Sequence, residues 1–295
     1  MKSSFSSYHP LVNFTYYLLV LLFTMFFMHP ACLLISLLCA AGYAVYLGGR
    51  KTLGFQLKYL LPLLLLTAVL NPAFNHQGAT ILTYLPSGNP LTLESIVYGF
   101  ASAVMLAAVV AWFQSYNLIM TSDKFIYLFG RIIPSLSLVL SMTLRFVPKF
   151  KAQLKLVSDA QRCVGRDVSA GPLSRRLRTA MKIFSIMVTW ALENAMETAD
   201  SMKSRGYGLP GRTAFSIYRF DRRDRRMLAF LLLCAAAVGG GALSGGLRWR
   251  YFPTMQGTAG GEAAVFCLLY LALCLAPLVA DLWADRYWKA LRRAG

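Results

Sequence analysis

The stretch LVNFTYYLLVLLFTMFFM, residues 11–28, decides the fold class because it runs for 18 positions without a charged side chain. A helix needs about 20 mainly apolar residues to cross a bilayer. Further mainly apolar runs follow at 31–47, 58–74, 95–119, 227–247 and 263–283. Hydrophobic residues make up 57% of the 295 positions and charged residues only 14%, which excludes an ordinary soluble domain. The sequence therefore predicts an all-α, polytopic membrane protein with about six transmembrane helices.

The positive charge is concentrated in the middle of the chain. Of 30 Lys and Arg residues, 18 lie between Arg145 and Arg226, and the formal net charge is +18. Because Lys and Arg collect in cytoplasmic loops, this segment is expected on the cytoplasmic side of the cell membrane. Both termini are expected on the same side. We expect N-terminal transmembrane helices over 1–120, an interfacial and cytoplasmic block of amphipathic helices over 121–226, and C-terminal transmembrane helices over 227–295.

Residues 121–148 do not read as an ordinary span. The segment is apolar but short, and Arg131, Pro134 and Arg145 interrupt it. We expect an interfacial or half-buried helix, since a full span would place the basic block outside, against the charge bias, unless another span is miscounted. The number of membrane crossings around 121–148 stays open.

Two amphipathic helices are predicted inside the basic block. Apolar residues at helical spacing are Phe150, Leu154, Val157, Ala160 and Val164 in the first, and Val188, Leu192, Ala195, Ala199 and Met202 in the second. Gly165 is placed to end the first helix as a left-handed cap, while Gly206, Gly208 and Pro210 end the second. The first half of the second helix is apolar nearly all round, so we expect it to contact membrane or another protein.

Arg205 follows the second apolar stripe and allows two interpretations. A cation in the last helical turn interacts favourably with the helix dipole, worth about 0.3–1 kcal/mol. Alternatively, an arginine at the end of an apolar face that binds a partner can place its planar guanidinium in an acidic pocket of that partner. The residue pattern alone leaves both open.

Other residue clusters favour structural roles. Asn71, Pro72, Asn75, His76 and Gly78 follow an apolar run, where Pro72 is expected to end the helix and the loop to form a turn. His76 is not expected to bind metal, and the six cysteines contain no CxxC pair, so neither a zinc site nor a disulfide framework is indicated. The basic run 221–226 is interpreted as an anchor to anionic lipid, not as a nucleic-acid site.

Four stretches, in order along the chain, resemble one family. ADSMKSRGYG (199–208) resembles the second Ala/Ser-Arg-Gly signature of the transmembrane T component of energy-coupling factor (ECF) transporters, the family that includes the cobalt-transport Q-type subunits. HPLVNFTYYLL (9–19) is similar to its N-terminus, and GRIIPSLSLVLSMTLRFVPKF (130–150) to the run before its first coupling helix. NPAFNHQG (71–78) is similar to its Asn-Pro-x-Phe-x-His-x-Gly loop, which matches Asn71, Pro72, Phe74, His76 and Gly78.

The resemblance implies a scaffold and not an enzyme. In such transporters two cytosolic ATPase subunits bind the coupling helices, and a small substrate-binding S component, for vitamins or transition metals, packs in the membrane. The resemblance implies that Ser204, Arg205 and Gly206 seat in a groove of one ATPase subunit. No GxxxxGK[ST] phosphate loop occurs in the sequence, so ATP chemistry is expected in a partner, and no cofactor is indicated. Cargo choice in this family belongs to the S component.

The first coupling helix departs from the family pattern. Its counterpart also tends to end in Ala-Arg-Gly, and alignment of AQRCVGRD (160–167) on Gly165 places Val164 where that arginine is expected. Arg162 and Arg166 are possible substitutes on the neighbouring face.

Two other functions are alternatives to the scaffold. An ion-coupled secondary transporter usually buries an acid or histidine in the middle of the membrane, whereas Glu94, Glu262 and Asp281 fall at or near span ends. A membrane enzyme that acts on lipid phosphates would need clustered Asp or His residues at the cytosolic face. Copurification of nucleotide-binding subunits would separate the scaffold from both.

Overall fold

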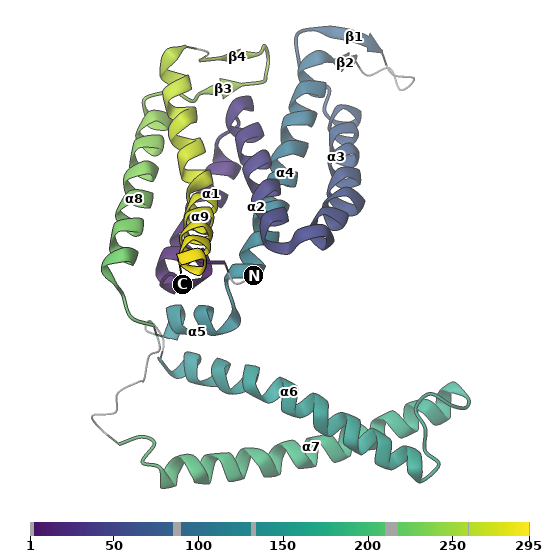
Figure 1. The fold of residues 1–295 in the computed structure, drawn as a ribbon. Helices are drawn as coiled ribbons and strands as arrows, with labels where there is room; N and C mark the ends of the chain where they lie inside the picture. Colours follow the sequence, from purple (N-terminus) through teal and green to yellow (C-terminus); the bar gives the residue numbers. More distant parts are fainter. Residues whose placement is uncertain (1–2, 85–89, 131–133, 210–217, 259, 295) are drawn as a thin grey trace. The chain divides into compact units, whose positions relative to one another are not determined.

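The chain folds into two units. The computed structural model describes residues 3–84, 90–130, 134–209, 218–258 and 260–294. We call Met1–Phe125 with Tyr218–Gly295 the membrane unit, and Ile126–Ile217 the paired-helix unit. Helices dominate both units (Figure 1), and the few strands are short, which confirms the predicted all-α class.

Six apolar helices build the membrane unit. Each overlaps one predicted span: α1 (Pro10–Phe26), α2 (Pro30–Phe55), α3 (Leu61–Phe74), α4 (Leu93–Ile119), α8 (Arg222–Leu243) and α9 (Gly261–Ala294). Among the described residues, four segments are long and apolar enough to cross a membrane, namely Pro30–Phe74, Leu93–Ile119, Arg222–Leu243 and Gly261–Ala290, and Pro10–Phe26 is a shorter apolar helix. The first of these segments contains a break at Gly49, with φ of 62°, and the π-helical turn η2 (Gln56–Leu60). The chain therefore reverses direction between α2 and α3 (Figure 1). The chain is a multi-pass membrane protein.

Two small hairpins lie at one end of the membrane unit, and the termini lie at the other (Figure 1). Strand β1 (Ile81–Tyr84) pairs antiparallel with β2 (Pro90–Thr92), and β3 (Trp249–Arg250) pairs antiparallel with β4 (Gln256–Gly257). One hydrogen bond links the two hairpins. The amide of Ala79, just before β1, donates to the carbonyl of Pro253, between β3 and β4, at 3.1 Å.

A polar network holds four helices together inside the apolar core. Trp112 of α4 is fully buried, and its indole N–H donates to the Ser36 hydroxyl of α2 at 2.9 Å. Ser36 Oγ lies 2.7 Å from Thr24 Oγ1 of α1, which lies 3.0 Å from the Tyr270 hydroxyl of α9. Polar groups within a bilayer need internal partners, and these hydroxyls and the indole supply one another.

The N-terminal segment is fixed to the end of the last helix. It forms a short 3-10 turn, η1 (Phe5–Ser7), in front of α1. The buried carboxylate of Asp281 in α9 accepts from the Phe5 amide at 2.6 Å, from Ser3 Oγ at 2.7 Å and from the Tyr43 hydroxyl at 3.1 Å. Asp281 is thus held by three donors from the N-terminal segment and α2.

A buried lysine fixes the other side of the N-terminal segment. Lys124 lies in α5 (Ser122–Gly130), and its ammonium donates to the carbonyls of Ser6 at 2.6 Å and Ile119 at 3.0 Å. Burial lowers the pKa of Lys124 from its ordinary value to about 8. The lysine thereby joins the start of α5 to the end of α4 and to the N-terminal turn.

The expectation that Pro72 ends its helix is wrong. Helix α3 continues through Pro72 to Phe74. Proline has no N–H and so leaves the carbonyl of Ala68, four residues earlier, without its helical partner. Gly99 of α4 lies against this carbonyl, since a Cβ at Gly99 would be 2.9 Å from Ala68 O and 3.0 Å from Pro72 Cδ. The close approach of α4 covers the proline-containing turn, and proline is tolerated in a spanning helix when neighbours cover the freed groups.

The paired-helix unit consists chiefly of two long helices. Helix α6 (Pro134–Cys163) and helix α7 (Leu173–Ser204) cross each other (Figure 1). At the crossing, Val157 of α6 packs with Ile183 and Met187 of α7 in a small apolar cluster, with Phe150 and Trp190 against it.

One sequence expectation for this unit needs correction. Residues 121–148 do not form one interfacial helix, because they divide between α5 and the first half of α6, which continues through Pro148. In the described part of the chain, neither α5 nor α6 is among the helices long and apolar enough to cross a membrane. In the first half of α7, Ile183 and Met187 are buried against α6, while the predicted contact of this half with membrane or another protein stays a prediction. The two predicted helices cover part of each other's apolar stripe.

Candidate docking site on the paired helices

Helix α7 ends in a glycine-dependent motif built around Arg205. Arg205 is the C-cap residue, and Gly206 follows with a left-handed φ of 78°. The Gly206 amide donates to the Lys203 carbonyl and the Tyr207 amide to the Met202 carbonyl, both at 3.0 Å. This pair of bonds defines a Schellman motif, which satisfies carbonyls at the end of a helix.

Helix α6 ends in the same motif. Gly165 has a left-handed φ of 76°, as predicted from the sequence. Its amide donates to the Arg162 carbonyl and the Arg166 amide to the Gln161 carbonyl, both at 2.9 Å. Val164 therefore occupies the C-cap position in α6 that Arg205 occupies in α7, although Val164 has no charge.

The side chains at both caps are exposed. Val164 is 69% exposed, and Arg205 is also exposed. Within the described part of the chain Arg205 forms no ion pair. Ser204 next to it donates its hydroxyl to the Ser201 carbonyl at 2.9 Å, which turns this side chain back onto its own helix. A guanidinium at a rigid helix end thus stands free for a partner's carboxylate.

The two arginines that flank Val164 differ in their surroundings. Arg162 Nε lies 3.1 Å from Asp167 Oδ2, and Asp167 also accepts from the backbone and hydroxyl of Ser169 at 2.8 and 2.7 Å. These bonds from Ser169, with the Arg162 guanidinium, lower the pKa of Asp167. Arg166 makes no ion pair with any residue that the structure describes. Of the two, Arg166 has the unoccupied charge and Arg162 is held beside the cap.

A positively charged cavity lies between α6 and the C-terminal half of α7. It has a volume of about 660 Å³, and Arg205 lines it together with Arg145, Lys149 and Glu197. Lys149 donates to Asn194 Oδ1 at 3.0 Å and lies 5.7 Å from the centre of the Trp190 ring. Three cations against one carboxylate suit an acidic partner. The sequence reasoning missed Arg145 and Lys149, whose spacing of four residues on one helix face was the available signal.

An apolar face of α7 is uncovered. Its exposed side chains recur at helical spacing: Leu173, Leu177, Met181, Phe184, Val188, Leu192 and Met196. Among them Leu177, Phe184 and Leu192 are each more than 60% exposed. Contiguous exposed apolar surface marks sites of interaction with proteins or membranes. The stripe predicted for the second half of α7 is therefore present and extends toward the start of the helix.

Residues 75–78, which follow the end of α3, form a compact turn over the start of α4. Ser95 Oγ donates to the Asn75 carbonyl at 2.5 Å, and Thr92 Oγ1 donates to the Gln77 carbonyl at 2.7 Å. Gly78 has a φ of 145°, and a Cβ there would meet Thr92 Oγ1 at 2.7 Å. Glycine is therefore required at position 78 by both conformation and space.

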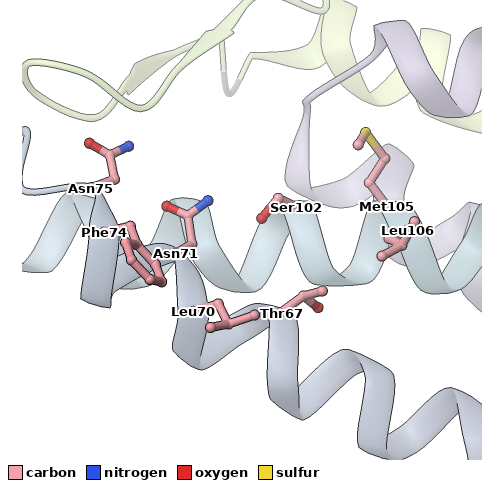
Figure 2. A pocket seen from close by; sticks show the side chains of 8 residues that line it. All are labelled: Thr67, Leu70, Asn71, Phe74, Asn75, Ser102, Met105 and Leu106. Carbon is pink, nitrogen blue, oxygen red and sulfur yellow. The ribbon is translucent and has the colours of Figure 1, made fainter.

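The end of α3 helps to line a groove between α3 and α4. The groove has a volume of about 510 Å³ and is lined by Thr67, Leu70, Asn71, Phe74, Asn75, Ser102, Met105 and Leu106 (Figure 2). Phe74 is 81% exposed, and His76 is half-buried in the turn. Asn71 and Phe74 thus contribute to the groove, while Gly78 serves the turn.

A bundle of apolar helices joined to a crossed pair of amphipathic helices defines a multi-pass membrane protein with a separate paired-helix unit. The family model described as "CbiQ: Cobalt transport protein" matches residues 2–215. The chain belongs to this family, which confirms the resemblance read from the sequence.

Known relatives carry a common description. The chain is 28% identical over 251 residues to the energy-coupling factor transporter transmembrane protein EcfT of Bacillus selenitireducens, covering 80% of this chain and 92% of the relative. It is 32% identical over 102 residues to EcfT of Lactobacillus helveticus, 34% of this chain and 37% of that protein. With EcfT of Listeria innocua it shares 26% identity over 201 residues, covering 62% and 74% of the two chains.

Proposed function

We propose that this chain is the T component of an ECF-type importer. It would be a non-catalytic scaffold that couples ATP hydrolysis by two cytosolic ATP-binding subunits to movement of a membrane-embedded, substrate-binding S component, for uptake of a vitamin or a transition metal. Membership in the cobalt transport protein family and the names of its EcfT relatives support this role. ATP hydrolysis itself is assigned to the partner subunits.

The observation that carries the proposal is the matched pair of helix ends. Two long amphipathic helices end in the same Schellman motif, and each presents one exposed C-cap side chain, Val164 or Arg205. Two similar ends suit two similar partners. The cationic cavity beside Arg205 and the apolar face of α7 add the charge and the apolar area that a stable contact needs.

The proposed orientation in the cell membrane places both termini in the cytoplasm. The termini lie at one end of the membrane unit (Figure 1), and the basic tail of α9, with Arg286 and Lys289, belongs to that end. Arg222, Arg223, Arg225 and Arg226 begin α8 at the same end. An excess of Lys and Arg on one side favours the cytoplasmic location.

The ion-coupled secondary transporter has less support. Its ion site would require an acid within the membrane region that is free to bind an ion. Asp281 is bonded to three donors, and Asp224 accepts from the amides of His9 and Asp221 at 3.1 Å each, in a helix cap. Both acids are thus engaged in fixing the fold.

The decisive experiment compares two arginines of the paired helices. Membranes that contain the tagged chain with its ATP-binding subunits are solubilised, and the retained subunits are measured for the wild type, Arg205→Ala and Arg166→Ala. Removal of one partner of a desolvated charge pair costs about 2–5 kcal/mol, so Arg205→Ala should release at least one subunit and stop transport. Arg166→Ala should retain both. Equal, negligible losses in the two variants, or failure of ATP-binding subunits to copurify with the wild type, would refute the proposal.

A further inference from the structure

Three metal-binding side chains meet in the membrane unit, at the end opposite the termini. His29 is the N-cap of α2, Cys32 lies three residues later, and Cys267 comes from α9, 235 positions further along the chain. One ligand atom from each residue lies within 4.8 Å of the others. His29 and Cys32 converge because Pro30 begins the helix at N1, so the cap side chain and the third helical residue share one end of the helix.

The sulfur atoms are spaced for a shared metal ion. Cys32 Sγ and Cys267 Sγ are 3.5 Å apart. With metal–sulfur bonds of about 2.3 Å, tetrahedral Zn²⁺ holds two thiolate sulfurs at roughly 3.8 Å. A shift of a few tenths of an ångström therefore converts the observed pair into two ligands of one ion.

The imidazole of His29 is buried and has one ring nitrogen without a partner among the described residues. His29 is 7% exposed; its Nε2 lies 3.4 Å from the Thr258 carbonyl, while its buried Nδ1 has no hydrogen-bond partner in the described part of the chain. Metal-binding histidines typically direct the other ring nitrogen to a carbonyl or carboxylate, which fixes the tautomer. The Trp249 ring packs edge-on against the imidazole with centroids 5.3 Å apart, and so limits its rotation.

A cavity reaches the cluster. It has a volume of about 460 Å³, and His29, Trp249 and Cys267 are among its lining residues. The Trp249 indole nitrogen is buried and has no partner among the residues described. With three protein ligands, a tetrahedral Zn²⁺ has a fourth position for a water molecule.

We propose that His29, Cys32 and Cys267 bind one divalent transition-metal ion of the Zn²⁺ class. Thiolate and imidazole ligands suit Zn²⁺. On binding, both thiols release their protons to solvent, and two thiolates with one divalent cation form a neutral set, which an apolar site tolerates better than a lone charge. No change of oxidation state is involved. The site uses no residue of α6 or α7 and does not depend on the proposed transport role.

The test measures metal bound to the purified full chain. The protein is prepared in detergent with a thiol-free reductant, stripped with chelator and dialysed against Zn²⁺. We expect one Zn²⁺ per wild-type chain, and at least about tenfold weaker binding in Cys32→Ser and in Cys267→Ser, since even outer-sphere changes cost that much. Cys39→Ser, a substitution on the same helix seven residues away, is the matched control and should bind as the wild type does.

A second variant and a second signal guard against misfolding. His29→Gln retains a side-chain donor for the Thr258 carbonyl, and it should keep the melting temperature of the metal-free protein while losing Zn²⁺ affinity. Co²⁺, used in place of Zn²⁺, should give thiolate charge-transfer absorption that disappears in Cys32→Ser. Zn²⁺ retained by the Cys32→Ser/Cys267→Ser double variant, no Zn²⁺ on the reduced wild type, or a Cys32–Cys267 disulfide in the protein isolated without reductant would each overturn the site.

Discussion

Val164 and Arg205 hold the same position in two copies of one helix-ending motif. Each is a C-cap residue followed by a left-handed glycine, and each motif contains the same two backbone hydrogen bonds. The geometry of the two ends is thus equal while their charge is not. If each end meets a similar ATP-binding subunit, the two contacts differ in strength for a reason that lies in one side chain.

Restoring the missing arginine should strengthen the weaker contact. In Val164→Arg the new guanidinium stands on a rigid, exposed cap, and a hydrogen bond to a charged group is worth about 1.5–3 kcal/mol, or roughly 10- to 150-fold in affinity. The measurement is the dissociation rate of ATP-binding subunits from the detergent-solubilised complex. Leu156→Arg adds the same charge at an exposed position of α6 away from the cap, and equal strengthening by this control would contradict a specific anchor.

The left-handed glycines should be needed for both caps. Alanine in this conformation costs about 1–2 kcal/mol, so Gly165→Ala and Gly206→Ala should loosen the helix ends and weaken subunit binding. At Gly206 a Cβ would also meet Leu209 Cδ1 at 3.1 Å, whereas at Gly165 it would meet nothing within 4 Å. Faster amide hydrogen exchange at Tyr207 in Gly206→Ala would report the loss. Unchanged exchange would show that the motif tolerates a side chain.

The contact of α3 with α4 should depend on Gly99. A methyl group there would lie 2.9 Å from Ala68 O and 3.1 Å from Asn71 Cβ, so Gly99→Ala must separate the helices at the proline-containing turn. Overpacking of this kind costs about 1–3 kcal/mol, seen as a lower melting temperature in detergent. Gly240→Ala in α8 is the control because its Cβ would meet nothing within 4 Å. An equal effect in both variants would exclude steric crowding as the cause.

The charge of Lys124 should make stability rise with pH in an alkaline window. Its pKa is about 8 in the folded protein, because burial disfavours the ammonium, and about 10.4 in an unfolded chain. Between these values the unfolded chain holds more protons, so the free energy of unfolding increases with pH. We expect the melting temperature of the wild type to rise from pH 8 to pH 10 relative to Lys124→Met. Lys155→Met, at an exposed position of α6, should follow the wild type, and a flat or falling difference for Lys124→Met would contradict the assignment.

Patterns of neighbouring residues predicted the helix ends and the apolar helices correctly. Gly165 and Gly206 follow amphipathic stripes, and glycine at that place has few other uses than a left-handed cap. The apolar runs likewise predicted where the six apolar helices lie, because a helix in a bilayer needs a long apolar stretch.

Features that depend on contacts between helices distant in the sequence were not predicted. Pro72 appeared to end a helix, yet the approach of Gly99 lets α3 continue. Ile183 and Met187 pack against Val157 of another helix, a contact that the apolar pattern of α7 alone does not predict. The cluster of His29, Cys32 and Cys267 has no spacing to recognise, since it joins two helices that are 235 residues apart in sequence.

The fastening of Ser3 and Phe5 to Asp281 has a consequence for biogenesis. The ribosome has made nearly the whole protein before the acceptor of these first residues exists, and residues 126–217 emerge in between as an insertion. The helices made earlier are therefore in place before the N-terminal segment can be fixed to α9. A ribosome stalled shortly before codon 281 should leave the N-terminus accessible to protease, and release of the finished chain should close it.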